Sequence, residues 1–228
     1  MSWVAFVPLL LGGVDAGTPP SPPATGSIAG KVQAASKLSS PTIVYLEPVG
    51  AAPARALPPP SSSQRQKVTQ KDLRFEPGAL VVHVGDTVDF PNEDRVFHNV
   101  FSVSSGNEFD LGIYREGMTK SVQMKKAGEV DILCNLHPEM EAKMLVLANE
   151  LFAPVGEDGS YRIASIPAGS YSLRVWSATH ETAQRTVEVS AGQERRADFQ
   201  LEPRKRRKML PQHAIDEASS PPSPKRKR

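Results

Sequence analysis

The sequence predicts an all-β protein built from two β-sandwiches. Short segments in which apolar and polar residues alternate recur along the chain, as in Leu80–Val84 and Tyr171–Trp176. The 228 residues include 16 Gly and 21 Pro, which stand between these segments and indicate turns and linkers. Residues 67–148 show no 3.6-residue apolar period of the kind that predicts a helix. Short strands separated in this way are typical of antiparallel sandwiches.

The central part of the chain supplies the strands of the first sandwich. Residues 80–84 alternate, Gly85-Asp86 predicts a turn, and residues 87–90 begin the next strand. Further strands are predicted at residues 118–124, 129–133 and 142–147. Two polar segments stand at the ends of such strands, and they carry the candidate functional residues.

The only cysteine of the chain is Cys134, in the segment Cys134-Asn-Leu-His137-Pro-Glu-Met140. This segment places a thiolate, an imidazole and a thioether within seven residues. Copper that cycles between Cu(I) and Cu(II) is held by one Cys and two His in a trigonal plane, with a weak axial Met. A second histidine, His98, lies at the start of a predicted strand. The predicted metal ligands are therefore His98, Cys134, His137 and Met140.

Three alternatives compete with this interpretation. Structural zinc sites usually take paired Cys and His ligands, and the chain has one thiol. A Cys/His nucleophilic pair finds no oxyanion hole or orienting partner in the sequence. Met144 is a second thioether near the loop, but its place in a predicted strand favours core packing over axial ligation.

Three segments, Phe75–Asn92, His98–Val100 and Cys134–Met140, resemble the cupredoxins, and among them the amicyanin-like members with a short ligand loop. The resemblance covers about residues 67–148. It implies a Greek-key sandwich with one type 1 (blue) copper held by the four ligands named above. It also implies that Asn99 connects the two ligand segments by a hydrogen bond. The implied function is transfer of single electrons between redox partner proteins, without enzymatic activity.

Residues 150–202 contain a second set of alternating strands separated by Asp-Gly and Pro-Ala-Gly turns. They resemble a carboxypeptidase regulatory-like sandwich of the immunoglobulin/transthyretin-like type, but its first two strands are absent before Leu151. Residues 26–32 and 41–47 match those two strands. This indicates a split sandwich, 26–47 plus 150–202, with residues 67–148 inserted and residues 48–66 as a linker. The alternative is that two domains follow one another in series. In that case residues 26–47 form an edge hairpin on the cupredoxin-like domain.

The N-terminal residues predict export. Residues 1–16 form an apolar run that is too short to span a bilayer and indicates a signal peptide, although it lacks a basic start. Residues 17–25 are a Pro-rich linker. No other segment is long and apolar enough to be a transmembrane anchor. We expect a periplasmic or secreted protein.

The C-terminal tail, residues 203–228, carries nine Lys/Arg and two acidic residues, which leaves a net −5 for residues 1–202 because the whole chain is +2. Such a tail is expected to be disordered. Binding to anionic lipid or to an acidic surface is the interaction it favours, and a merely solubilising role is the alternative. Export and a copper site argue against nucleic acid as the partner.

Other functions make different demands on the chain. A copper storage or delivery protein needs an exposed, exchangeable site, and a copper oxidase needs a second copper with more His than the five present. An adhesion or interaction role for the second sandwich remains open. The other histidines, His83, His180 and His213, are interpreted as non-ligands, with His180 in an exposed loop; Trp176 is expected in the core. An apolar docking rim is expected from Phe97, Phe101, Leu136 and Pro138.

Overall fold

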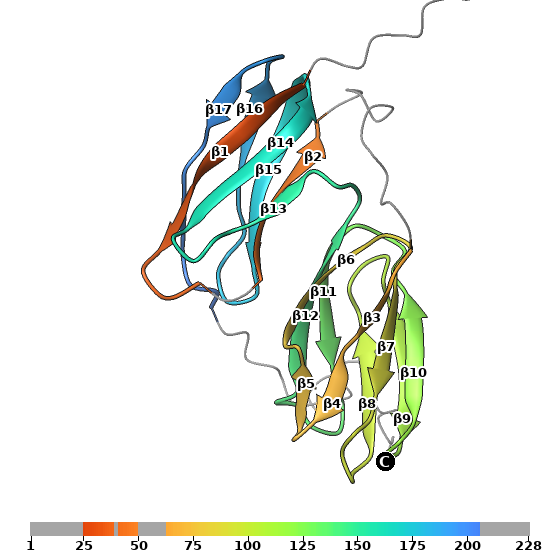
Figure 1. Cartoon of the computed structure of the whole chain (residues 1–228). Coiled ribbons are helices and arrows are strands. Elements are labelled where there is room, and N and C mark those ends of the chain that lie inside the picture. Colours follow the sequence, from red (N-terminus) through yellow and green to blue (C-terminus); the bar gives the residue numbers. More distant parts are fainter. Residues whose placement is uncertain (1–24, 39–40, 50–62, 206–228) are drawn as a thin grey trace, which may run out of the picture.

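The computed structural model describes residues 25–38, 41–49 and 63–205 (Figure 1). Within these ranges every regular element is a strand, and the strands form two sandwiches. We call one of them the split sandwich, because its strands come from both ends of the described sequence. The other is the central sandwich. The predicted all-β fold class is confirmed.

The split sandwich consists of two facing sheets around one apolar core. The first sheet contains β1 (Thr25–Ala34), β14 (Ser160–Pro167), β17 (Glu194–Arg196) and β18 (Phe199–Leu201). The second sheet has the order β13 (Phe152–Pro154), β2 (Thr42–Pro48), β15 (Gly169–Ser177) and β16 (Ala183–Val189). Both N-terminal strands therefore pair with strands more than 100 residues later in the sequence, as in Ile28 opposite Ile163.

The central sandwich places a three-stranded sheet opposite a five-stranded one. The smaller sheet has the order β10 (Thr119–Gln123), β7 (Thr87–Pro91) and β3 (Arg65–Lys67). The larger has the order β6 (Ala79–His83), β12 (Glu141–Leu147), β11 (Gly128–Leu133), β8 (His98–Ser102) and β9 (Phe109–Tyr114). A separate hairpin, β4 (Thr69–Lys71) and β5 (Arg74–Glu76), lies beside these sheets.

The two sandwiches share an apolar layer, which we call the junction. Its buried side chains are Ile43, Tyr45, Leu145, Leu147 and Trp176. Because β2 packs one face on its own core and the other on the junction, five successive residues of it, from 42 to 46, are buried. Burial of each large side chain stabilises the contact by roughly 1.5–3 kcal/mol.

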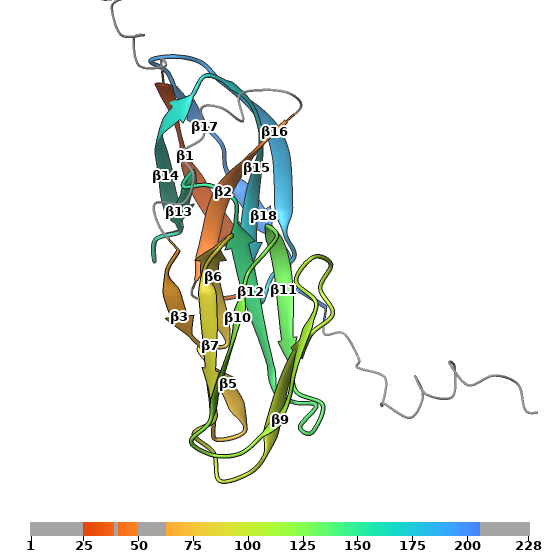
Figure 2. The same ribbon diagram turned by 90° about the vertical axis from the view of Figure 1, so that its right-hand side faces the viewer.

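The ligand segments lie at the end of the central sandwich that points away from the split sandwich. Figures 1 and 2 both show β11 running away from the split sandwich, so Cys134, which follows it, lies at the far end. The antiparallel neighbour β8 begins at this same end with His98. The junction therefore leaves the end that carries the ligand segments uncovered.

All the strands expected from alternation in the central region are present, with ends that differ by one or two residues. Sequence reasoning missed β13, β17 and the β4–β5 hairpin, whose strands have three residues each, and β9, where Gly112 interrupts the alternation. Strand β3 begins at Arg65, inside the predicted linker. The predicted signal peptide, most of the linkers and tail residues 206–228 lie outside the described residues. Among the described residues, no helix is long and apolar enough to cross a membrane.

Candidate metal centre

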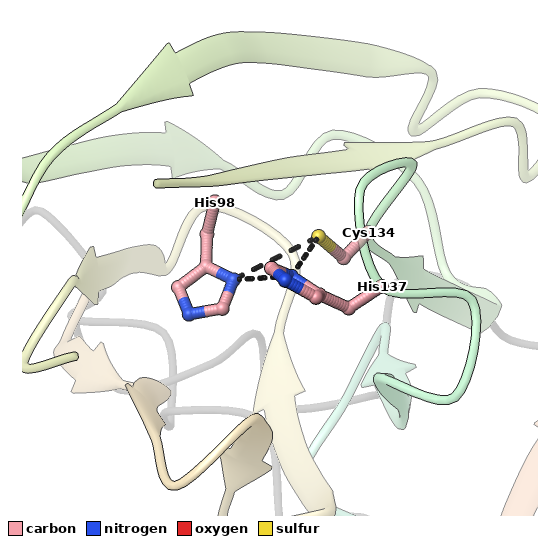
Figure 3. A group of neighbouring side chains, drawn as sticks. All are labelled: His98, Cys134 and His137. Carbon is pink, nitrogen blue, oxygen red and sulfur yellow. Dashed lines mark hydrogen bonds between the residues drawn. The ribbon is translucent and has the colours of Figure 1, made fainter. Parts of the chain in front are cut away.

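Three of the four predicted ligands converge at the far end of the central sandwich (Figure 3). The Nδ1 atoms of His98 and His137 are 3.0 Å apart. The Sγ atom of Cys134 lies 4.0 Å from Nδ1 of His98 and 3.8 Å from Nδ1 of His137. Two imidazole nitrogens and a sulfur thus face one point, although their residues come from two segments 36 positions apart.

This triangle has the size that a metal requires. With those three sides, the point equidistant from the three donor atoms lies about 2.1 Å from each of them. This agrees with the bond lengths of zinc, another first-row metal ion, which are roughly 2.0–2.1 Å to His nitrogen and 2.3 Å to Cys sulfur. Cys134 is a free, buried thiol, 1% exposed. A thiolate and two imidazoles in a trigonal arrangement are the donor set of a blue-copper site. The residues present therefore fit copper.

Met140 closes the loop that carries two of the donors. Its backbone N–H donates to the carbonyl oxygen of His137 at 2.9 Å, which makes a tight turn. The Met140 side chain is 1% exposed and packs in the same core cluster as Cys134. Met144 lies within β12 and is equally buried in that cluster, as expected of a core residue.

A hydrogen bond holds the two ligand segments together. The backbone N–H of Asn135 donates to Oδ1 of Asn99 at 2.7 Å. Asn99 follows His98 and is 3% exposed, whereas Asn135 is exposed, so the bond is partly buried. This confirms the connecting role expected for Asn99. Because each ligand segment also extends from a strand of the larger sheet, the donors are held on a stiff support.

The outer nitrogen of His98 has a partner that sequence reasoning missed. Nε2 of His98 lies 2.8 Å from Oδ2 of Asp94, and the His98 side chain is fully buried. Burial acts to raise the pKa of Asp94, but hydrogen bonds from His98 and from the amides of Leu73 and Asp72 outweigh it and leave that pKa below its usual value. The sequence offered one sign of this partner: the carboxylate of Asp94 lies four residues before the candidate ligand His98.

The remaining described histidines do not join this group. His83 is partly buried against the ring of Phe152, near the carboxylates of Asp86 and Glu150. His180 was expected in an exposed loop, and this expectation is wrong, since the residue is 1% exposed. Its backbone pairs with the segment after β18 in a β-bridge to Pro203. The fifth histidine, His213, lies outside the described residues.

Apolar residues adjoin the two candidate histidine ligands in the sequence. Phe97 and Leu136 are 58% and 44% exposed, and Pro138 is exposed as well. Phe101 is only partly exposed. These four are the residues expected to form the docking rim. His137 is more exposed than His98 or Cys134 and is the donor nearest to solvent.

Sequence comparisons agree with both resemblances. Amicyanin-alpha of Methylorubrum extorquens is 29% identical over 90 residues, which cover 38% of this chain and 74% of that protein. The chain contains a region similar to the cupredoxins. Residues 149–202 match the family described as carboxypeptidase regulatory-like domain. The two resemblances predicted from sequence are thereby confirmed.

Solved structures similar to the chain include a proline-to-alanine mutant of amicyanin in its oxidized state. It is 28% identical, with a TM-score of 0.35, and the match covers 36% of this chain and 82% of that one. A purple cupredoxin from Nitrosopumilus maritimus is 20% identical, with a TM-score of 0.33, and the match covers 36% and 99%.

Proposed function

We propose that this protein is an exported type 1 copper protein that carries single electrons between redox partners. The observation that carries the proposal is the convergence of His98, Cys134 and His137, whose donor atoms all lie within 4.8 Å of one another. Met140, buried on the same loop, is the proposed axial ligand. Resemblance to the cupredoxins supports copper as the metal.

Bound copper would supply a one-electron couple, Cu(I)/Cu(II), and the chain would supply a fixed set of donors. Asn99 and the strands on either side keep the donors in place, so little rearrangement accompanies the change of charge. His98 and Cys134 are buried, which excludes water from the inner side of the site. A site closed in this way suits electron transfer better than copper delivery, because passing copper to another protein requires ligands that are exposed to solvent.

We propose His137 as the point where electrons enter and leave, since this residue is partly exposed and the exposed apolar residues Phe97, Leu136 and Pro138 adjoin the two histidines in the sequence. An apolar rim of this kind supports brief docking of a redox partner protein. Such encounters use small interfaces, under about 1,200 Å² in total.

The decisive experiment adds Cu(II) to the purified protein and records its visible spectrum. We expect an intense thiolate-to-copper charge-transfer band that Cys134→Ser abolishes. Met144→Leu is the matched control, because Met144 is an equally buried sulfur residue of the same core and its substitution should keep the band. A colourless protein that binds copper stoichiometrically would refute electron transfer through a blue site and favour copper storage.

We further propose that residues 67–148 form a domain inserted between residues 26–47 and 150–202 of a regulatory-like domain. Support comes from the pairing of β2 with β13, which places the two insertion points side by side: the N–H of Leu46 donates to the carbonyl oxygen of Leu151 at 3.0 Å. Insertion is tolerated where the ends of a surface loop lie close together.

The insertion is tested by expressing residues 63–149 with the junction residues Leu145 and Leu147 changed to Thr, because these side chains lose their cover in the fragment. A soluble fragment that turns blue with copper is the expected result. An unfolded fragment, beside an intact chain that turns blue, would mean that the boundaries are wrong.

Localisation and the tail complete the proposal. Export is supported by the apolar run at residues 1–16. The basic residues of the tail, nine in positions 203–228, suit contact with anionic lipid or an acidic partner surface. To test this contact, binding of the full chain and of a chain ending at residue 205 is measured on vesicles with and without anionic lipid. Equal binding by both chains to the anionic vesicles would refute it.

A further inference from the structure

The buried ligand His98 is held from both sides of its ring. Nδ1 faces the other donors, and Nε2 lies 2.8 Å from Oδ2 of Asp94. The His98 side chain is 0% exposed and that of Asp94 is 13% exposed. A neutral imidazole carries its proton on one nitrogen only, so a carboxylate at Nε2 leaves Nδ1 free as a metal ligand.

Asp94 is itself held by groups that come from outside the ligand segment. Its carboxylate accepts the N–H of Asp72 at 2.7 Å and that of Leu73 at 3.1 Å. Its own N–H donates to Oδ1 of Asn92 at 2.9 Å. The carboxylate therefore has little freedom to turn away from the imidazole.

The two donating amides belong to the tip of the β4–β5 hairpin. Asp72 and Leu73 both have left-handed backbone conformations, with φ of 51° and 56°. Such values suit Gly or Asn better than Leu, and for a branched residue they are uncommon. The turn that results directs both N–H groups at Asp94.

We propose that Asp94 is the positioning residue of the copper centre, which selects the Nε2-protonated form of His98 and stabilises Cu(II) over Cu(I) with its negative charge. This inference rests on the proposed function. A carboxylate in a site with little water acts more strongly on a nearby charge than one in solvent. Substitution of a residue that hydrogen-bonds to the outer nitrogen of a metal-binding histidine commonly lowers metal affinity 10- to 100-fold.

The test compares Asp94→Asn with Glu93→Gln in the copper-loaded full chain at one fixed pH. Both changes remove one negative charge from adjacent residues, but Glu93 is exposed and has no contact with a ligand among the described hydrogen bonds and ion pairs. For Asp94→Asn we expect affinity for Cu(II) to fall about tenfold relative to Cu(I). The midpoint potential then rises by about 59 mV, the tenfold equivalent for one electron. Glu93→Gln should shift it far less, and Asp94→Glu should restore most of the wild-type value.

Equal potentials in Asp94→Asn and wild type, or equal shifts in the two variants, would overturn the proposal while leaving the blue band and the proposed function intact. If the wild-type chain forms no blue band, the proposed function fails, and the metal-free protein still decides the inference. There, ¹H–¹⁵N spectra of the neutral imidazole should place the proton of His98 on Nε2. A proton on Nδ1 with bare Nε2 would refute the role of Asp94, and this measurement also serves if Asp94→Asn does not fold.

Discussion

Each sandwich contains a buried histidine, and the two differ in what faces the ring. His98 in the central sandwich has a carboxylate on Nε2 and an imidazole and a thiol near Nδ1. His180 in the split sandwich has hydroxyl groups on both sides, with Ser36 Oγ 3.0 Å from Nε2 and Thr179 Oγ1 2.9 Å from Nδ1. Burial is nearly equal, at 0% and 1%.

This difference shows which property marks a metal site. Hydroxyl groups donate to and accept from a neutral ring, so the hydrogen bonds of His180 are complete without any ligand. His98 instead points a nitrogen at another nitrogen and a sulfur, both of which are metal donors. Convergence of donors, rather than burial, distinguishes the candidate metal ligand.

The largest expected effect comes from breaking the convergence. His98→Ala should abolish the charge-transfer band, because the site would lose one of its two imidazole donors. His180→Ala is the matched variant from the other sandwich and should keep the band. The measurement is copper titration followed by visible spectroscopy. A blue His98→Ala protein without added imidazole would contradict the ligand assignment.

The next effect concerns the layer that joins the two sandwiches. Trp176→Ala removes a fully buried side chain from the junction and should lower the free energy of unfolding by about 3–5 kcal/mol. Denaturant unfolding measures this. Ile113→Ala, at a site 61% exposed, is the control and should change stability by less than about 0.5 kcal/mol. Equal effects would mean that the junction contributes no packing energy.

A smaller effect is expected at His180 itself. His180→Ala leaves the hydroxyls of Ser36 and Thr179 without their partner and should cost roughly 1–3 kcal/mol of unfolding free energy. Copper binding should be unchanged, since this histidine belongs to the other sandwich. Loss of copper affinity in this variant, with folding intact, would show that the two histidines are not independent.

The smallest effect is expected for an ion pair across the junction. Nη2 of Arg204 lies 3.1 Å from Oε2 of Glu129, with side chains 23% and 35% exposed. A double-mutant cycle with Arg204→Gln and Glu129→Gln should give a coupling energy below about 1 kcal/mol, because water and salt screen such pairs. A coupling well above this value would mean that the ion pair, and not the apolar layer, dominates the contact between sandwiches.

Part of the centre was predictable because it is local in sequence. Cys134, His137 and Met140 share one short loop, and the donor chemistry alone pointed to copper. Asp94 was not predicted, although it lies only four residues before His98. A carboxylate at that spacing has no preferred partner until the β4–β5 hairpin directs its amides at it.

The sequence by itself determined the strands with clear alternation, the donor residues and the two resemblances. Alternation reports that one face of a strand is buried, and this was sufficient for the first half of β14. It does not report what covers the other face. In β2, that information came only from the junction, where Ile43 and Tyr45 meet the central sandwich.

Only the tertiary structure decided contacts that neither a local pattern nor a resemblance predicted. It set the residue-by-residue register of β1 and β2 against strands near the other end of the chain, paired His180 with Pro203, and directed the amides of Asp72 and Leu73 at Asp94. The physical reason is that a strand's hydrogen bonds and apolar face accept any complementary partner. The choice among partners depends on the packing of the whole chain, which no local pattern encodes.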